Sequence, residues 1–348
     1  MTYEGQRRVA VVGCGYWGVN HVRILTEILG AEAVVACDAD VDRLDAMAER
    51  FPGIGTISSI EALAQDEAVD AAVIATPATL HLETAMPLID AGKHLLVEKP
   101  ITVTSDDAVE VISAADAAGI TLAVGHTFLF NPGVAAVKQR VASGGAGQLH
   151  YLYARRCNLG PIRHDVNAMW DLVPHDVSIF NHLVDGAATS VSAVGSRLLG
   201  NEREDVGFVT IRYDNGVIAN IHASWADPFK VREFVVVGSE ERLCFDDTDP
   251  DRPVTVVTRG VRGPAPQESE PYVVHDGDPD PIDVAASEPL KNQTLHFLDC
   301  LRTGERPSSD GETGLRVVEV MEAIDESIAL GGTPVEVERH MTEGRIPA

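Results

Sequence analysis

The sequence has no long apolar run and little cysteine. No stretch approaches the ~18–20 apolar residues of a transmembrane helix, and no apolar stretch typical of a signal peptide precedes the first glycines. The five cysteines are odd in number, widely spread and without a C-x-x-C pair, so neither a disulfide framework nor a zinc site is indicated. We therefore expect a protein of the reducing cytoplasm that binds no metal.

Positive charge is also scarce. The 27 Lys and Arg residues face 53 Asp and Glu residues, which gives a formal net charge of −26. Nucleic acid and anionic membranes need a positive footprint, so this balance argues against both as main partners. The length of 348 residues predicts two domains at roughly 100–200 residues each, and 45% of apolar residues suffices for a full core.

Residues 1–130 alternate short apolar strands with helical patterns. The strands are apolar throughout, as expected for a parallel sheet that is covered on both faces by crossover helices. We predict a doubly wound α/β domain here. Its predicted strands are Arg8–Val12, Ala33–Cys37, Ala71–Ala75, His94–Val97 and Thr121–Val124, and its predicted helices are Trp17–Leu29, Val41–Arg50, Leu80–Ala91 and Ser105–Ala118.

Residues 131–348 follow a different pattern, with longer and partly alternating strands. Asp214-Asn215-Gly216 is a hairpin turn signal between two of them, so we predict an α+β domain with an antiparallel sheet. Residues 246–283 are rich in Pro, Gly and Asp and are expected to contain long surface loops. The predicted strands are Gln148–Asn158, Ser190–Leu199, Val206–Tyr213, Val217–Trp225 and Arg232–Val237, and the predicted helices are Val177–Leu183 and Leu315–Leu330.

A glycine-rich motif, Gly13-Cys14-Gly15-Tyr16-Trp17-Gly18, joins the first strand to a helix. This is the context of a dinucleotide fingerprint. Gly13 permits the tight turn, Gly15 lets the backbone approach a pyrophosphate, and Gly18 lets the helix pack on the sheet. The helix N-terminus attracts the anion. The motif, with Tyr16 and Trp17, is interpreted as a cofactor-binding turn, and the alternative is a turn without a ligand.

Asp38 ends the second strand, 20 residues after Gly18. A carboxylate there can accept hydrogen bonds from a ribose 2′-hydroxyl, and it would repel a 2′-phosphate. We therefore expect NAD(H) to be favoured over NADP(H). Arg43, five residues further on, weakens this argument because an arginine can accommodate the 2′-phosphate.

Glu98-Lys99-Pro100 follows the strand His94–Val97. Ligands of open α/β sheets bind beyond the carboxyl ends of the strands, so Lys99 is expected to face the cofactor crevice. Its ammonium can hold a substrate hydroxyl and stabilise negative charge that develops on the oxygen. The alternative is a surface lysine paired with Glu98.

Thr76-Pro77 follows the strand Ala71–Ala75, and it is expected to shape the nicotinamide side of the same crevice. His81 lies a few residues later. It is a candidate for the same cofactor site, or a histidine at a helix start with no ligand role.

Asp171 and His175 are four residues apart, so they share a face if a helix runs through them. An imidazole oriented by a carboxylate is a suitable general base. Two alternatives remain open at this point. Asp171 could cap a helix that starts near Pro174, or the pair could contribute to a metal site, although no cluster of three or four ligands is evident.

Residues 148–164 carry three arginines and no acidic residue in this acidic chain. Such a cluster suits an anionic substrate, with ordinary surface salt bridges as the alternative. Arg155 and Arg156 are adjacent on a predicted strand and must point to opposite faces. Asn158 shares a face with Arg156, and Arg163 follows the strand.

Taken together and in this order, the motifs resemble those of the glucose–fructose oxidoreductase / inositol dehydrogenase (Gfo/Idh/MocA) family, over essentially the whole chain. The resemblance implies an NAD-binding Rossmann domain followed by an α+β domain with a large, mostly antiparallel sheet. It also implies dimers or tetramers that associate through that sheet. It implies that Lys99 is catalytic, that His175 is the acid/base with Asp171 nearby, and that a cis bond precedes Pro100.

The stretch from Arg155 to Arg163, continuing through Asp165 to Trp170, is similar to the sugar-nucleotide dehydrogenase branch. The resemblance implies oxidation of UDP-N-acetylglucosamine, or of its uronic acid, at C3. The substrate-binding candidates are Lys99, Arg156, Asn158, Arg163, Asp171 and His175. Inositol and free-sugar dehydrogenases are close alternatives, and a non-catalytic NAD(H)-binding regulator and an NAD-dependent glycoside hydrolase are more distant ones.

Overall fold

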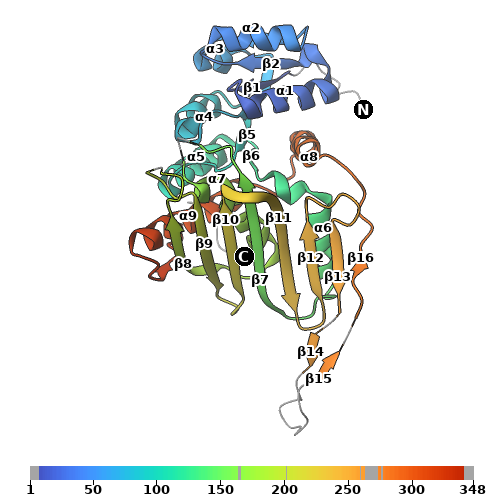
Figure 1. Ribbon diagram of the computed structural model, residues 1–348. Helices are drawn as coiled ribbons and strands as arrows, with labels where there is room; N and C mark the ends of the chain where they lie inside the picture. Colours follow the sequence, from blue (N-terminus) through green and yellow to red (C-terminus); the bar gives the residue numbers. More distant parts are fainter. Residues whose placement is uncertain are drawn as a thin grey trace. The chain divides into compact units, whose positions relative to one another are not determined.

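The computed structural model in Figure 1 describes residues 8–163, 166–200, 202–258, 260–262, 273–275 and 277–340. The chain divides into two compact units. The first comprises residues 1–127, 288–319 and 339–348, and the second comprises residues 128–287 and 320–338. No described helix is long and apolar enough to cross a membrane.

The first unit is built on a six-stranded parallel sheet with the order β3-β2-β1-β4-β5-β6. The strands are β1 (Arg8–Val12), β2 (Val34–Cys37), β3 (Gly55–Ile57), β4 (Val69–Ile74), β5 (His94–Glu98) and β6 (Leu122–Gly125). The helices are α1 (Tyr16–Leu29), α2 (Val41–Arg50), α3 (Ile60–Gln65), α4 (His81–Asp90), α5 (Ser105–Ala118) and α8 (Pro289–Thr303). The predicted Rossmann-type α/β fold is confirmed.

Burial explains why these strands are apolar along their whole length. Every residue of β2 and the last four residues of β1 are buried. Helices therefore cover both faces of the sheet, as a parallel sheet requires. The strand β3 was not predicted from the sequence, because a three-residue strand that is only partly buried has no continuous apolar run.

The second unit is built on a nine-stranded sheet with the order β16-β13-β12-β11-β7-β10-β9-β8-β17. All its pairs are antiparallel except β7 with β10, so the predicted mostly antiparallel sheet is confirmed. Its strands are β7 (Leu149–Leu159), β8 (Ala188–Ser196), β9 (Val206–Tyr213), β10 (Ile218–Ser224), β11 (Ala226–Gly238), β12 (Arg242–Asp246), β13 (Val254–Val257), β16 (Asp280–Pro281) and β17 (Val335–Glu336).

Helices cover one face of this sheet. The helices α6 (Pro132–Ala142) and α7 (Ala168–Leu183) pack against it, and the second half of α9 (Gly311–Ala329) belongs to the same unit. In Figure 1 no described helix of this unit lies over the other face. That face carries the exposed aromatic side chains of Tyr151, Tyr153 and Phe208.

One expectation for this half needs correction. The helix predicted from Val177 begins at Ala168, where the Asn167 side chain accepts a hydrogen bond from the Trp170 amide at 2.9 Å. Asp171 is therefore inside the helix, and its interpretation as a helix cap is wrong.

The segment 246–283 also carries strands that were not predicted from the sequence. They include β13 and a hairpin of β14 (Gly260–Arg262) and β15 (Val273–His275).

Candidate active site

The glycine-rich turn after β1 has no room for side chains at two of its three glycines. A Cβ on Gly13, whose φ is +92°, would lie 2.8 Å from the backbone of Ala75 and Thr76. A Cβ on Gly18 would lie 1.8 Å from the carbonyl oxygen of Gly13. At Gly15 a Cβ would meet nothing within 4 Å. The backbone is therefore open at Gly15, where the fingerprint requires a pyrophosphate to approach.

The N-terminus of α1 is also suited to an anion. Its N-cap residue, Gly15, has no side chain to accept a hydrogen bond from the first turn, and that turn contains no acidic residue. Its amide N–H groups and the helix dipole are thus available to a phosphate. The exposed rings of Tyr16 and Trp17 begin this helix and contact each other edge to face, with centroids 5.4 Å apart.

Asp38 lies directly after β2 and binds the same turn. Its Oδ2 accepts a hydrogen bond from the Cys14 amide at 2.7 Å, and its Oδ1 accepts one from the Asp40 amide at 2.9 Å. Arg43 Nη1 is 3.7 Å from Oδ2. These residues fit a dinucleotide: the carboxylate is fixed beside the turn, where it can accept a hydrogen bond from a ribose hydroxyl, and Gly15 with α1 would hold the pyrophosphate.

Lys99 follows β5, and its peptide bond to Pro100 is cis, as expected. The preceding carboxylate of Glu98 is buried. Its Oε1 is 2.8 Å from His21 Nε2, and its Oε2 accepts a hydrogen bond from the Lys99 amide at 3.2 Å. Burial raises the pKa of Glu98, but the hydrogen bond and charge of His21, with help from Lys99, outweigh burial and hold that pKa below its usual value. Glu98 therefore fixes the backbone of the lysine.

His81 is buried at the start of α4, and both ring nitrogens face backbone carbonyls. Its Nδ1 lies 3.0 Å from the Pro100 oxygen and 3.1 Å from the Ile101 oxygen, and its Nε2 lies 3.0 Å from the Thr76 oxygen. Burial lowers the pKa of His81, and these hydrogen bonds offset part of the shift. The imidazole thus ties the end of β4 to the loop that carries Lys99.

A histidine that was not predicted from the sequence lies beside Lys99. Glu98 and Gly125 are paired in adjacent strands, so Lys99 and His126 are the next residues at the same sheet edge. His126 is fully buried, and neither ring nitrogen has a hydrogen-bond partner among the described residues. Burial, and then the charge of Lys99, lower its pKa to about 4 although Glu98 opposes them. Its position directly after β6, at the carboxyl end of a predicted strand, could have identified it from the sequence as a residue of this site.

In the second unit, Asp171 lies one helical turn before His175 on α7. Its Oδ1 accepts a hydrogen bond from Arg163 at 3.2 Å, and its Oδ2 accepts one from the Trp225 indole at 3.0 Å. The His175 ring contacts the Phe128 ring edge to face, with centroids 5.1 Å apart. Arg163 is therefore joined to Asp171 in the first turn of α7, and His175 follows one turn later in the N-terminal half of the helix. Asp165, in the same stretch of sequence, lies outside the described residues.

The two adjacent arginines point to opposite faces, as expected. Arg155 is exposed and lies 3.4 Å from Glu233. Arg156 is buried, and its Nε and Nη2 each donate a hydrogen bond of 2.8 Å to Asp176. Asn158 donates to the carbonyl oxygen of Gly160 at 2.5 Å. The charge of Arg156 is thus already balanced inside the unit.

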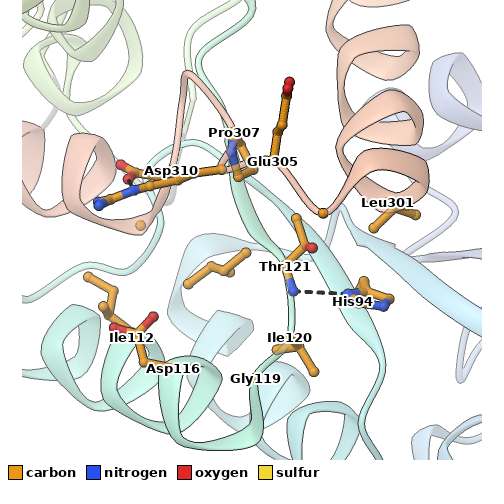
Figure 2. Close-up of a pocket in the computed structure, with 14 residues that line it drawn as sticks. His94, Ile112, Asp116, Gly119, Ile120, Thr121, Leu301, Glu305, Pro307 and Asp310 are labelled. Atoms are coloured by element: carbon orange, nitrogen blue, oxygen red, sulfur yellow. Dashed lines mark hydrogen bonds and ion pairs between the residues drawn. The ribbon is translucent and has the colours of Figure 1, made fainter.

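Within the first unit, the predicted cofactor residues all lie at the carboxyl ends of β1, β2, β4 and β5, where ligands of open α/β sheets bind. A cavity of about 370 Å³ opens at the other end of this sheet, beside His94 and Thr121 (Figure 2). It contains none of the predicted site residues. No three His, Cys, Asp or Glu side chains gather as metal ligands in the part of the chain that the structure describes.

Named relatives resemble the whole chain. D-apiose dehydrogenase of Paraburkholderia graminis is 27% identical, over 97% of this chain and 91% of the relative. Inositol 2-dehydrogenase 2 of Saccharopolyspora erythraea is 27% identical, over 94% and 95%. Among solved structures, the WlbA dehydrogenase of Bordetella pertussis, in complex with NADH and UDP-GlcNAcA, has the same fold, with a TM-score of 0.78 and 22% identity over 96% of this chain and 99% of that one.

Family models match both units. The oxidoreductase family with an NAD-binding Rossmann fold matches residues 7–126, and the Gfo/Idh/MocA C-terminal domain matches residues 134–244. The order of the motifs, the turn built for a dinucleotide and these matches agree. The chain belongs to the Gfo/Idh/MocA family and is an NAD-dependent oxidoreductase.

Proposed function

We propose that this protein transfers a hydride between the nicotinamide and a secondary alcohol of a sugar. The preferred substrate is a nucleotide sugar, such as UDP-N-acetylglucosamine or its uronic acid, oxidised at C3. The observation that carries this proposal is the Arg163–Asp171 pair at the start of α7, with His175 one turn further along the same helix. It combines a general base, a carboxylate that can orient substrate, and a cation suited to an anionic substrate.

The proposed chemistry assigns one role to each side chain. When bound, the cofactor supplies the hydride acceptor, C4 of its nicotinamide. His175 removes the proton from the substrate hydroxyl, and Lys99 donates a hydrogen bond to the same oxygen, whose negative charge it stabilises. Asp171 orients or tunes this pair of His175 and Lys99. The alcohol thereby loses a hydride from carbon and a proton from oxygen, and it becomes a ketone.

The anionic part of the substrate is bound by the basic residues of the second unit. Arg163 offers a fork of donors that suits a diphosphate, and its side chain is 40% exposed. Arg156 and Asn158 act with it less directly, because Asp176 and Gly160 already engage their nitrogens. Asp176, the partner of Arg156, directly follows His175 on α7.

Three finer points belong to the same proposal. NAD(H) is favoured over NADP(H) because Asp38 would repel a 2′-phosphate. The reaction needs no metal, because Lys99 supplies the electrostatic stabilisation. The protein is a cytoplasmic homodimer or homotetramer that associates through the uncovered face of the nine-stranded sheet, where Tyr151, Tyr153 and Phe208 are exposed.

A second candidate is a dehydrogenase of inositol or of a free sugar, and the similarity to inositol 2-dehydrogenase favours it. A neutral polyol has no need of Arg163. The test is a measurement of NAD⁺ reduction with UDP-N-acetylglucosamine, its uronic acid, free sugars and inositols. Turnover with a nucleotide sugar supports the first candidate, turnover with neutral polyols alone supports the second, and NADH binding without turnover of any of them supports a regulator.

A further inference from the structure

The second unit contains an arginine that the sequence analysis did not single out. Arg232 on β11 is paired directly with Arg156 on β7. Opposite residues of an antiparallel pair share a face, so two guanidinium groups lie side by side on the face that α7 covers. Like charges in this position destabilise a sheet. The presence of this destabilising pair in the folded protein therefore suggests that one of the two arginines has a function.

The two arginines differ in how their charge is neutralised. Arg156 makes two hydrogen bonds to Asp176, and its guanidinium carbon lies 4.3 Å from the centre of the Phe128 ring. Arg232 has only one ion pair among the described residues, with Nη1 4.0 Å from Asp247 Oδ2. That separation is too long for a hydrogen bond. The other oxygen of Asp247 accepts a hydrogen bond from Asn131 at 3.0 Å.

The guanidinium of Arg232 is therefore incompletely satisfied. Its Nε is buried and has no hydrogen-bond partner among the described residues. Its side chain is nevertheless 35% exposed, so solvent or a ligand can reach it. Burial and then the charge of Arg156 lower the pKa of Arg232, although Asp247, Asp171 and Asp176 oppose this shift. Buried donors in native proteins are normally paired, and an exception points to a missing partner.

The position of Arg232 indicates what that partner is. Phe128 contacts the His175 ring on one side and the Arg156 guanidinium on another, and Arg156 is the cross-strand neighbour of Arg232. We propose that Arg232 binds a negatively charged group of the substrate, a carboxylate or a phosphate, beside His175. This inference rests on the proposed function of the second unit and narrows its substrate class to anionic sugars.

The chemistry of the two other arginines supports this assignment. One nitrogen of Arg163 already donates to Asp171, and two nitrogens of Arg156 already donate to Asp176. Arg232 has only the long ion pair with Asp247 and no side-chain hydrogen bond among the described residues, and a guanidinium can bind the two oxygens of a carboxylate or phosphate side by side. Binding such a group would also reduce its repulsion with Arg156.

The test is calorimetric titration of the full-length protein saturated with NADH. The probes are UDP-N-acetylglucosamine, its uronic acid and N-acetylglucosamine. We expect Arg232→Met to weaken binding of the uronic acid about tenfold or more, the loss typical of a charged hydrogen bond, and to leave N-acetylglucosamine unaffected. If Arg232 binds the carboxylate, UDP-N-acetylglucosamine is also unaffected. If it binds the diphosphate, both nucleotide sugars lose affinity equally.

Two variants guard against a general loss of structure. Arg155→Met removes a neighbouring arginine that points to the opposite face and pairs with Glu233, and it should not change binding. Arg232→Lys keeps the charge but not the fork, so its loss should be smaller than that of Arg232→Met. Because Arg232→Met relieves repulsion with Arg156, its Tm should equal or exceed that of the unmodified protein.

Unchanged affinity of Arg232→Met for both nucleotide sugars, an equal loss for N-acetylglucosamine, or no binding of either charged probe to the unmodified protein would overturn the inference. Parallel assays of NAD⁺ reduction separate it from the proposed function. Loss of anion binding in a protein that oxidises no sugar supports the role of Arg232 and rejects the proposed activity. Turnover of the uronic acid with an unchanged KM in Arg232→Met supports the proposed activity and rejects the role of Arg232.

Discussion

His21 and Glu98 form a buried pair that joins α1 to the strand before Lys99. His21 Nε2 lies 2.8 Å from Glu98 Oε1, across 77 residues of sequence. The second carboxylate oxygen accepts the Lys99 amide hydrogen. The helix that begins at the dinucleotide turn is thus linked, through one imidazole and one carboxylate, to the backbone of the proposed catalytic lysine.

We predict that His21→Leu destabilises the protein by about 3–5 kcal/mol, because it leaves a buried carboxylate without its partner. Urea unfolding measures this change. The double variant His21→Leu/Glu98→Leu should recover much of the loss, since no buried charge remains. A single variant as stable as the unmodified protein would show that the pair contributes nothing.

His126 should make the protein sensitive to acid. The pKa of His126 is about 4 in the folded protein, against 6.5 for a histidine that is exposed in the unfolded chain. The unfolded chain therefore binds the proton first as the pH falls. The free energy of unfolding therefore falls by up to about 1.4 kcal/mol for each pH unit between pH 6.5 and pH 4, and it is unaffected by His126 above pH 6.5. His126→Phe removes this component while Glu98 and Lys99, the charged groups that act on His126, remain.

Urea unfolding at a series of pH values tests this prediction. The difference in unfolding free energy between His126→Phe and the unmodified protein should shift in favour of the variant as the pH falls below 6.5. A difference that is independent of pH would mean that His126 takes up a proton in the folded state as readily as in the unfolded one.

Cofactor choice depends on Asp38. Asp38→Ala should narrow or reverse the preference for NAD(H), because it removes an acceptor for the 2′-hydroxyl and a charge that repels a 2′-phosphate. It should also weaken binding of both cofactors, because the Cys14 amide loses its acceptor. Asp38→Asn is the control, since it keeps an acceptor oxygen. Titration of NADH and NADPH by fluorescence measures both effects, and tighter NADPH binding by the unmodified protein would refute the preference.

Arg163 tests the charge of the substrate. For a nucleotide sugar, Arg163→Ala should raise KM by the equivalent of about 1–3 kcal/mol and leave NAD binding nearly intact. Rising salt should weaken substrate binding in the unmodified protein. Steady-state kinetics at two salt concentrations measures both. A KM that responds to neither the substitution nor salt would favour a neutral polyol.

The apolar strands and helical spacings of the first unit were sufficient to predict its parallel sheet, because strands covered on both faces carry a continuous apolar signal. The grouping of Asp171 with His175 was predictable from their spacing on α7. The cross-strand neighbours His126 and Arg232 were not, because register between distant strands is absent from local sequence. For the same reason, nothing in the sequence indicated that Asp176 would neutralise Arg156.

Lys99→Ala and His175→Ala should each lower kcat by about 10²–10⁴-fold, the usual loss for a positioned acid or base. NAD affinity should change much less for His175→Ala, because His175 belongs to the second unit and the dinucleotide turn to the first. Stopped-flow turnover with the true substrate, together with NADH titration, separates the two effects. Near-normal turnover by His175→Ala would reject its assignment as the general base.

Hydride transfer from a sugar carbon is the central claim, and isotope transfer tests it most directly. The protein is incubated with NAD⁺ and with nucleotide sugars, free sugars and inositols that carry deuterium on their ring carbons, and both products are analysed by mass spectrometry. The account predicts one deuterium in the reduced cofactor and a ketone at the carbon that lost it, both formed about 10²–10⁴-fold more slowly in Lys99→Ala and His175→Ala. A reduced cofactor without deuterium, or transfer at an unchanged rate in both variants, would contradict it.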